Sequence, residues 1–223
     1  MEFSLSSEQE MLIESARAFA ENELYPHEAE VEKSDSVSPD LAQKIRERAI
    51  EMGFYAANMP EDLGGGGLDC VSLSLVEREL GRANFALQYL VGRPSNILQA
   101  CVGEQRDHYL FPCIRGEKTD CLAMTEPGAG SDLRSMQCRA DVDGDDYVIN
   151  GTKHFISHAD IADFVILFAA TGEEESARGP RKLISAFLVD KGTSGFSVRP
   201  GSHSVSHRGY HNSMLPFANS RIP

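Results

Sequence analysis

The sequence predicts an α+β chain of two domains: an all-α helical domain over residues 1–118, followed by an antiparallel β-sandwich or β-barrel domain over residues 119–223. Up to about residue 118, apolar residues recur every three or four positions, as on one face of a helix. From about Thr119, short β-branched and aromatic runs alternate with glycine, proline and aspartate turns. A run of helices followed by a run of strands indicates separate domains rather than alternating βαβ units, which disfavours a Rossmann-type fold.

Helix start and stop signals follow one another through the first domain. Ser and Asp side chains accept backbone hydrogen bonds at helix starts, and proline fits the first helical position. Glycine or proline marks the expected ends. The signals are, in chain order, a capping box Ser7–Glu10, a kink or end at Pro26, a start at Ser38-Pro39, a cap at Gly53, a start at Asp69, and shorter helical segments at about 94–102 and 104–116.

Apolar stripes predict the buried face of the second and third helices. The two stripes are Leu41, Ile45, Ala49 and Met52, and then Val71, Leu75, Val76 and Leu80. Between these helices, Gly64–Gly67 predicts a loop of high backbone freedom. A phosphate cradle is the alternative, but no strand precedes the glycines and no Gly-Lys-Ser/Thr sequence follows them.

Four short runs are the expected strands of the second domain. They are Tyr147–Ile149, Phe164–Phe168, Ser185–Val189 and Gly195–Val198. Asp143-Gly144-Asp145-Asp146 is the expected hairpin turn before the first of them, and residues 171–181 form an expected polar loop between the second and third.

Composition excludes several classes of function. The net charge of −13 has the wrong sign for a nucleic-acid binder. No apolar stretch approaches the roughly 20 residues of a membrane-spanning helix, so no membrane association is expected. Five cysteines without a Cys-x-x-Cys pair, and an acidic N-terminus that resembles no targeting leader, favour reduced thiols and a cytoplasmic location. His154 and His158 flank an expected strand, so no metal site is expected.

The segment Ala123–Asp132 is the most informative part of the sequence. A strand runs into a Pro-Gly turn of small residues, which exposes backbone N–H groups and lets another molecule approach closely. Thr125 and Ser131 add hydroxyl groups beside them. The pattern fits a site for a polar, anionic ligand such as a pyrophosphate, next to a strand that could meet a flat polar ring. On composition alone, a plain hairpin turn remains the alternative.

The same segment resembles the signature of the acyl-CoA dehydrogenase family: Ala123 through Ser135 fits every specified position of that pattern. Three other blocks are similar to family motifs in the same order, and together they span nearly the whole chain. They are Pro60–Gly65, similar to "PExxGG"; Ile149–Ser157, similar to "INGxKxWIT"; and His207–Pro223, similar to "RGSxxxxLxFxxxRVP".

The resemblance implies an N-terminal helical domain, a middle β-domain and a C-terminal four-helix domain, with FAD between the last two and usually a homotetramer. The first two domains match the change of period described above. The sequence ends at Pro223, where the family's C-terminal helices would begin, so the third domain is expected to be absent. The resemblance therefore implies a truncated or fragmentary homologue with about half of the flavin site, which would carry FAD weakly or not at all.

Site residues follow from the resemblance position by position. Backbone groups of Leu122 and Met124, and the Thr125 hydroxyl, would meet the flavin pyrimidine edge. Gly130 and Ser131 would approach the pyrophosphate, and Ser131 would also border the acyl-CoA. Phe155, Ile156 and Ser157 would lie against the other face of the ring. Phe155 stands where the family usually has tryptophan, and Ser157 where it usually has threonine; both keep the chemistry.

Arg181 lies where the family loop nears the CoA arm, so its guanidinium could meet a phosphate; a solvated loop arginine is the equal alternative. The family reaction is α,β-dehydrogenation of an acyl-CoA, with electrons passed to electron-transfer flavoprotein. Its carboxylate base lies in the C-terminal domain, so no catalytic residue is assigned here, and Glu126 is not expected to serve. The alternatives are a non-catalytic interaction module and, among enzymes of the same folds, an acyl-CoA oxidase or a flavin monooxygenase.

Overall fold

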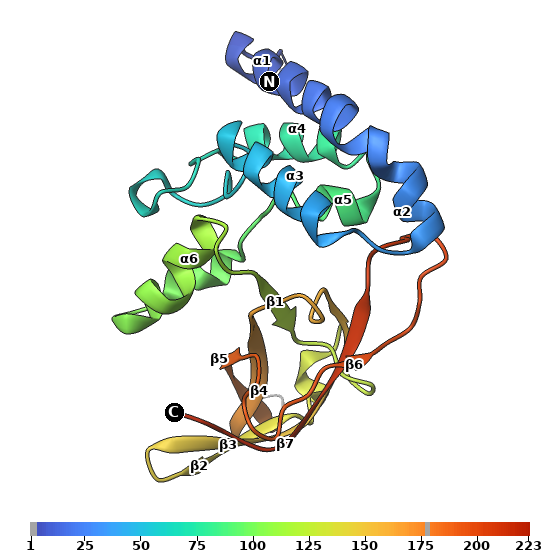
Figure 1. The fold of residues 1–223 in the computed structure, drawn as a ribbon. Helices are drawn as coiled ribbons and strands as arrows, with labels where there is room; N and C mark the ends of the chain where they lie inside the picture. The colour runs from blue at the N-terminus through green and yellow to red at the C-terminus, as the bar shows by residue number, and fades with distance from the viewer. Residues whose placement is uncertain (1–3, 177–178) are drawn as a thin grey trace. The chain divides into compact units, whose positions relative to one another are not determined.

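The computed structural model describes residues 4–176 and 179–223, which form two compact units (Figure 1). The helical unit comprises the chain up to Lys118 together with Ser204–Tyr210. The β unit comprises Thr119–His203 and His211–Pro223. The chain passes from the helical unit to the β unit between residues 118 and 119, and the segment Ser204–Tyr210, which was expected in the second domain, belongs with the helices by its contacts. For example, Gly209 N–H donates to Asp35 at 2.8 Å.

The helical unit contains six α-helices among the described residues. They are α1 (Ser7–Phe19), α2 (Glu28–Ser34), α3 (Pro39–Glu51), α4 (Cys70–Leu80), α5 (Phe85–Tyr89) and α6 (Phe111–Ile114). Short segments join them: π-helical Ala20–Leu24 and Arg106–Leu110, and 3₁₀-helical Tyr25–His27, Glu61–Leu63 and Asn96–Ala100. No helix in the described ranges is both long and apolar enough to cross a membrane.

Most of the predicted helix boundaries are confirmed. Ser38 caps α3 with Pro39 in its first turn, and Asp69 caps α4 by accepting from two backbone N–H groups. Pro26 lies in the 3₁₀ turn that separates the first helix from α2. The predicted capping box is wrong by one residue, because Ser6 and Gln9 form it rather than Ser7 and Glu10.

The predicted buried stripes are right at their centres and wrong at two ends. Ile45, Val76 and Leu80 are buried, but Val71 is 58% exposed and Met52 is 40% exposed. In α4 the buried face also carries Ser72 and Glu79, so two polar residues shift it away from Val71. Met52 lies beyond the last turn of α3, where fewer neighbours cover it.

The glycine run Gly64–Gly67 is used by the chain itself. Its four N–H groups donate to carbonyls of Ala56, Met59, Pro60 and Glu61. A Cβ at Gly65 would lie 2.3 Å from the Met59 carbonyl oxygen, so the glycine permits close packing of backbone on backbone. These amides are already committed, which supports a structural loop rather than a phosphate cradle.

The β unit is a mixed sheet. Its strands are β1 (Asp120–Ala123), β2 (Arg139–Asp143), β3 (Asp146–Ser157), β4 (Phe164–Glu174), β5 (Arg181–Asp190), β6 (Arg199–Pro200) and β7 (Asn212–Ile222). The order is β1-β4-β2-β3-β7-β6, with β5 paired to β4. The predicted class, helices followed by a β-domain, is confirmed. The sheet is not wholly antiparallel, because both β1 and β2 pair with β4 in parallel.

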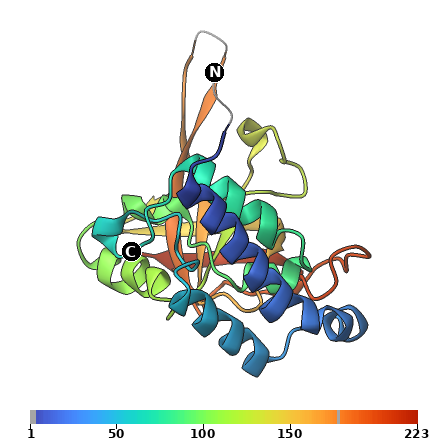
Figure 2. The same cartoon turned by 90° about the horizontal axis from the view of Figure 1, so that it is seen from above.

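Three of the four predicted strands are present, and all three are longer than expected. β4 and β5 extend as a long hairpin into the predicted polar loop (Figure 2). Residues 177 and 178 of that loop lie outside the described residues. Gly195–Val198 is wrong as a strand: only one bridge, Phe196 to Phe217, forms there. The turn at Gly144-Asp145 between β2 and β3 is confirmed.

The connection between β1 and β2 is anchored in the hydrophobic core on the buried side of the sheet. β1 and β2 follow one another along the same edge of β4, with Cys121 opposite Val165 and Arg139 opposite Ala170. The connection from residue 124 to residue 138 therefore leaves the sheet and returns to it beside the same strand. Met136 and Cys138, at the end of that connection, are almost fully buried. This anchoring holds the bend Thr125–Ser131 at both ends.

Candidate functional site

The bend Thr125–Ser131 lies directly against the end of β3. The His154 N–H donates to the Thr125 carbonyl at 2.8 Å, across 29 positions of sequence. The two segments singled out from the sequence are therefore neighbours within the β unit. We call residues 122–131 together with 154–157 the ledge.

A tight turn shapes the bend. The backbones of Glu126 and Ala129 exchange hydrogen bonds of 2.8 and 3.2 Å around Pro127-Gly128. Ala129 is buried beneath the turn, whereas Gly130 and Ser131 are exposed. A Cβ built at Gly130 would meet no atom within 4 Å, and its φ lies outside the left-handed region. Neither packing nor backbone conformation of this chain requires glycine there, so the missing side chain leaves room for another molecule.

A buried ion pair lies beneath the ledge. Lys153, which is 0% exposed, donates to Glu126 Oε1 at 2.8 Å and to the Met124 carbonyl at 2.9 Å. The Glu126 carboxylate also accepts from the backbone N–H groups of Gln137 at 2.6 Å and Cys138 at 2.9 Å. Burial by itself raises the pKa of Glu126, but Lys153 and these two N–H groups lower it overall. Glu126 is therefore a committed structural carboxylate, consistent with its exclusion as a base.

A bulge in β3 turns Phe155 outward. Ile149 and Lys153 point into the core four positions apart, but the next buried residue, Ile156, follows after only three. The register against β7 shifts between Lys153 and Ile156, and Phe155 has φ +56°. Non-glycine residues in this region are strained and concentrate at functional sites. The Phe155 ring is 56% exposed as a result.

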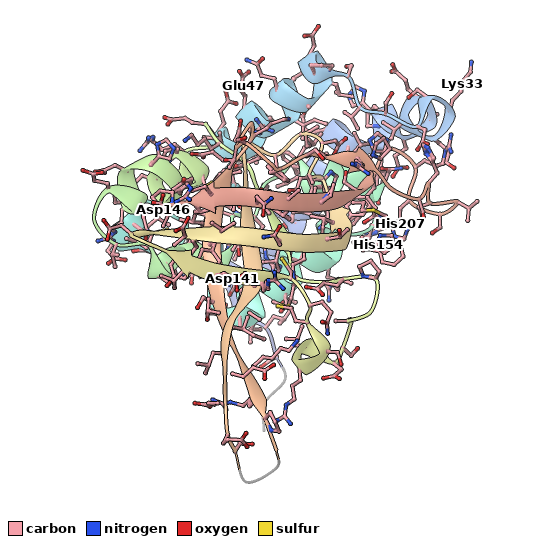
Figure 3. All side chains as sticks on the ribbon, turned by 90° about the horizontal axis from the view of Figure 1, so that it is seen from below. Lys33, Glu47, Asp141, Asp146, His154 and His207 are labelled. Atoms are coloured by element: carbon pink, nitrogen blue, oxygen red, sulfur yellow. The ribbon has the colours of Figure 1, made fainter. Side chains whose placement is uncertain are left out.

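The His154 ring packs against Phe155, with centroids 3.9 Å apart. His154 Nδ1 is buried and has no hydrogen-bond partner in the structure. Figure 3 shows His154 toward one end of β3, with Asp146 at the other end of the strand. The pair gives the ledge an aromatic surface with one unsatisfied nitrogen.

The other predicted cofactor residues contribute in different ways. Leu122 is 43% exposed, on a strand at the edge of the sheet whose outer backbone groups pair with no described strand. Ile156 is only 2% exposed, so its side chain belongs to the core and only its backbone is available. Ser157 Oγ donates to Asn212 Oδ1 at 3.5 Å, and Asn212 also lines a cavity of about 500 Å³. The ledge thus offers edge backbone, three hydroxyls (Thr125, Ser131 and Ser157) and an aromatic face.

Arg181 lies on the β4–β5 hairpin, at the first position of β5. Its guanidinium pairs with Glu174 at 2.6 Å, and both side chains are about half exposed. No group of His, Cys, Asp or Glu able to hold a metal ion occurs among the residues that the structure describes. Asp132, in the same bend, is held by Ser135 Oγ and the Arg134 N–H, which lower its pKa.

The ledge fits a flavin by its own chemistry. An edge strand can pair with the donor and acceptor atoms along one side of a pyrimidine ring, and an exposed aromatic ring suits a flat ligand. The open space at Gly130 suits a diphosphate.

Sequence reasoning missed Lys153. Its signal was its position: it lies an even number of residues from Ile149 and therefore shares the buried face of the strand.

Comparisons with known proteins match both units of the chain. The family model "Acyl-CoA dehydrogenase, N-terminal domain" matches residues 6–117, and "Acyl-CoA dehydrogenase, middle domain" matches residues 121–220. The short-chain specific acyl-CoA dehydrogenase of Clostridium acetobutylicum is 30% identical over 100% of this chain and 58% of its own length.

Two other relatives add information about cofactor and partner. A glutaryl-CoA dehydrogenase from Mycobacterium smegmatis, solved in complex with FADH2, is 26% identical with a TM-score of 0.83, covering 98% of this chain and 54% of its own. A subunit of the caffeyl-CoA reductase–Etf complex of Acetobacterium woodii is 32% identical over 98% of this chain and 57% of its own length. The chain spans about half the length of the curated relatives it matches.

Proposed function

Because this chain belongs to the acyl-CoA dehydrogenase family, we propose that its ledge holds the flavin of a FAD-dependent acyl-CoA dehydrogenase. The M. smegmatis relative with bound FADH2 supports FAD as the cofactor. The substrate proposed for the complete site is an acyl-CoA thioester. Bound FAD would supply the acceptor for the hydride equivalent that leaves the substrate.

The residues of this chain bind and orient rather than transfer the proton. Leu122 and Met124 offer backbone groups, and the Thr125 and Ser157 hydroxyls add hydrogen bonds at the ring edge. Gly130 and Ser131 accommodate the pyrophosphate, with Ser131 also bordering the substrate. Phe155 covers a face of the ring and excludes water from it, which strengthens the polar contacts made beneath it. Arg181 is retained as a proposed contact to the CoA phosphates once it leaves Glu174.

The proton-abstracting base of the family reaction is proposed to come from outside these 223 residues. The acid of the ledge and the one directly after it are already committed: Glu126 to Lys153, and Asp132 to Ser135 and the Arg134 N–H. A base must lie within hydrogen-bonding reach of the proton it removes. The 223-residue polypeptide should therefore show no dye-linked oxidation of acyl-CoAs. Turnover at the rate of a full-length relative would refute this part of the proposal.

The single observation that carries the proposal is the open space at Gly130. Since the fold does not need glycine there, a methyl group at this position should affect only a ligand that approaches the turn. The test is titration of the FAD-free protein with FAD, followed by flavin fluorescence. We expect weak saturable binding, weakened about tenfold or more by Gly130→Ala through a lost close contact.

Gly172→Ala is the matched control, because a Cβ there makes only ordinary contact with Leu183 at 3.7 Å, on the β4–β5 hairpin. It should leave both the affinity and the melting temperature unchanged. Equal affinities for wild type and Gly130→Ala would contradict a flavin at this turn. Absence of any saturable binding would instead favour the non-catalytic interaction module.

Electron-transfer flavoprotein is the proposed electron acceptor, supported by the A. woodii relative that belongs to an Etf complex. Self-association into a homo-oligomer is proposed with it. Native mass spectrometry with and without electron-transfer flavoprotein tests both.

A further inference from the structure

We propose that the buried Lys153–Glu126 pair is a positioning device: it fixes the Met124 carbonyl beneath the ledge and so determines which polar groups the ledge presents to the flavin. This inference rests on the proposed function and adds a residue, Lys153, that does not itself touch the ligand.

The pair ties together the segments that make the ledge. Lys153 comes from β3, Met124 from the end of β1, and Glu126 from the turn that follows. The carboxylate continues the connection to Gln137 and Cys138, where the chain re-enters the sheet as β2. One ammonium and one carboxylate therefore hold three stretches of backbone within hydrogen-bonding distance.

The pair fixes the direction of two successive carbonyl groups of the ledge, those of Met124 and Thr125. The Met124 oxygen accepts from Lys153 at 2.9 Å, and the Thr125 oxygen accepts from the His154 N–H at 2.8 Å. Both acceptors are occupied by donors of β3. The Thr125 hydroxyl and the outer backbone of β1 are then the polar groups left for a flavin edge.

Stability alone is a poor explanation of the pair. Removing a charged pair from water costs several kcal/mol per ion, and well-packed apolar residues of similar volume are often as stable or more so. An apolar side chain at position 153 could fill the same space, but it could not hold a carbonyl. The geometric role requires the hydrogen-bond donors of lysine, whereas filling the core does not.

The decisive variant is the double substitution Lys153→Met with Glu126→Leu, which removes both charges and keeps the volume. In the FAD-free protein we expect a lower melting temperature, because the N–H groups of Gln137 and Cys138 lose their acceptor. Beyond this general loss, the His154 amide should exchange about tenfold faster relative to other amides of β3, because the Thr125 carbonyl is no longer held in place. With FAD, the affinity should fall about tenfold or more, and the visible band of the bound flavin should change shape.

Lys182→Met is the matched control. Lys182 also donates from a strand to a backbone carbonyl, that of Met136, within the connection between β1 and β2. It makes no contact with Met124, so its loss should leave the His154 amide and the FAD affinity unchanged.

The single variant Lys153→Met adds a signature that a purely structural role would not give. Glu126 would then be buried without its cation, so protonation of the carboxyl at acid pH should restore stability, but neither the protection of the His154 amide nor the FAD affinity, because the Met124 carbonyl still lacks its donor. The charged or titratable groups facing Glu126 are Lys153 itself and the buried Cys138 thiol. Burial raises the pKa of the Cys138 thiol to about 11, so this thiol stays protonated at neutral and acid pH. The double variant should show no such recovery of stability. The measurements on Lys153→Met decide whether the pair positions the ledge if the double variant fails to fold.

An unchanged His154 amide in the double variant, or in the single variant at neutral pH, overturns the inference. Its failure is distinguishable from failure of the proposed function. If wild-type protein shows no saturable FAD binding, the flavin proposal is refuted, and the amide measurements made without FAD still decide whether the pair positions the ledge.

Discussion

The substitution Gly151→Ala should destabilise the β unit more than its small size suggests. Gly151 lies in β3 at a register shift, with φ +151°. A Cβ there would lie 2.6 Å from the Cα of Cys138 and 2.7 Å from its Cβ. Cys138 is fully buried, and its N–H donates to Glu126, so it cannot move away without disturbing the buried ion pair.

The magnitude follows from two costs. Overpacking of a tight core costs about 1–3 kcal/mol, and an L-residue in a sparsely populated backbone region adds about 1 kcal/mol. We therefore expect a loss of about 3 kcal/mol in the unfolding free energy of the β unit.

Gly144→Ala is the matched control, because Gly144 also has positive φ, +69°, but a Cβ there would meet nothing within 4 Å. It should cost only the backbone strain, about 1 kcal/mol. The difference of about 2 kcal/mol corresponds to about 30-fold in the unfolding equilibrium.

The assay is urea unfolding followed by hydrogen exchange of peptides from β3 and β7, which reports on the β unit separately from the helical unit. Gly151→Ala should also accelerate exchange at the Cys138 amide, which Gly144→Ala should not. Equal losses for the two variants would refute the close contact of Gly151 with Cys138.

Three further predictions concern other parts of the chain. Glu79 is 3% exposed and bound by three arginines, chiefly Arg17, which lower its pKa from 4.5 to about 2. The stabilisation from the ionised Glu79 is therefore complete above about pH 4.5 and lost as the pH falls to about 2. Glu79→Gln should remove this pH dependence of the unfolding free energy and cost about 2 kcal/mol in urea unfolding at neutral pH. An unchanged pH dependence would contradict the prediction. Phe155→Ala should change the unfolding free energy by less than about 0.5 kcal/mol, because the ring is 56% exposed, yet weaken FAD binding in the fluorescence titration; a large stability loss would show that the ring is structural. Iodoacetamide should label Cys70 alone in the native protein, because Cys70 is exposed whereas the other four thiols are buried. Burial also raises the pKa of Cys121 to about 12, which keeps its thiol unreactive. If mass spectrometry showed labelled Cys121 before unfolding, the buried position of this thiol would be wrong.

Features set by near neighbours in sequence were predictable. Ser38 and Asp69 cap their helices because their side chains reach N–H groups two or three residues away. The bend at Pro127-Gly128 was visible for the same reason: proline and glycine act on local dihedral angles. The candidate ledge could be located by these local signals and by motif resemblance.

Features that depend on distant partners were not predictable in the same way. The burial of Glu79 depends on the arginines that bind it, and one of them, Arg17, is 62 positions away. The parallel pairing of β1 with β4 depends on how the chain crosses the sheet. Neither is encoded in the period of a single segment.

The sequence by itself determined that helices precede strands, where most of the predicted helices begin, and the turn of small residues at 127–131, because short-range sterics and hydrogen bonds act within a few residues. Only the tertiary structure decided that Lys153 lies beneath that turn with Glu126, and that a bulge turns Phe155 outward beside it. A buried charge is stable only where its partner and its other hydrogen bonds converge from several segments, and that convergence exists only once the sheet has formed.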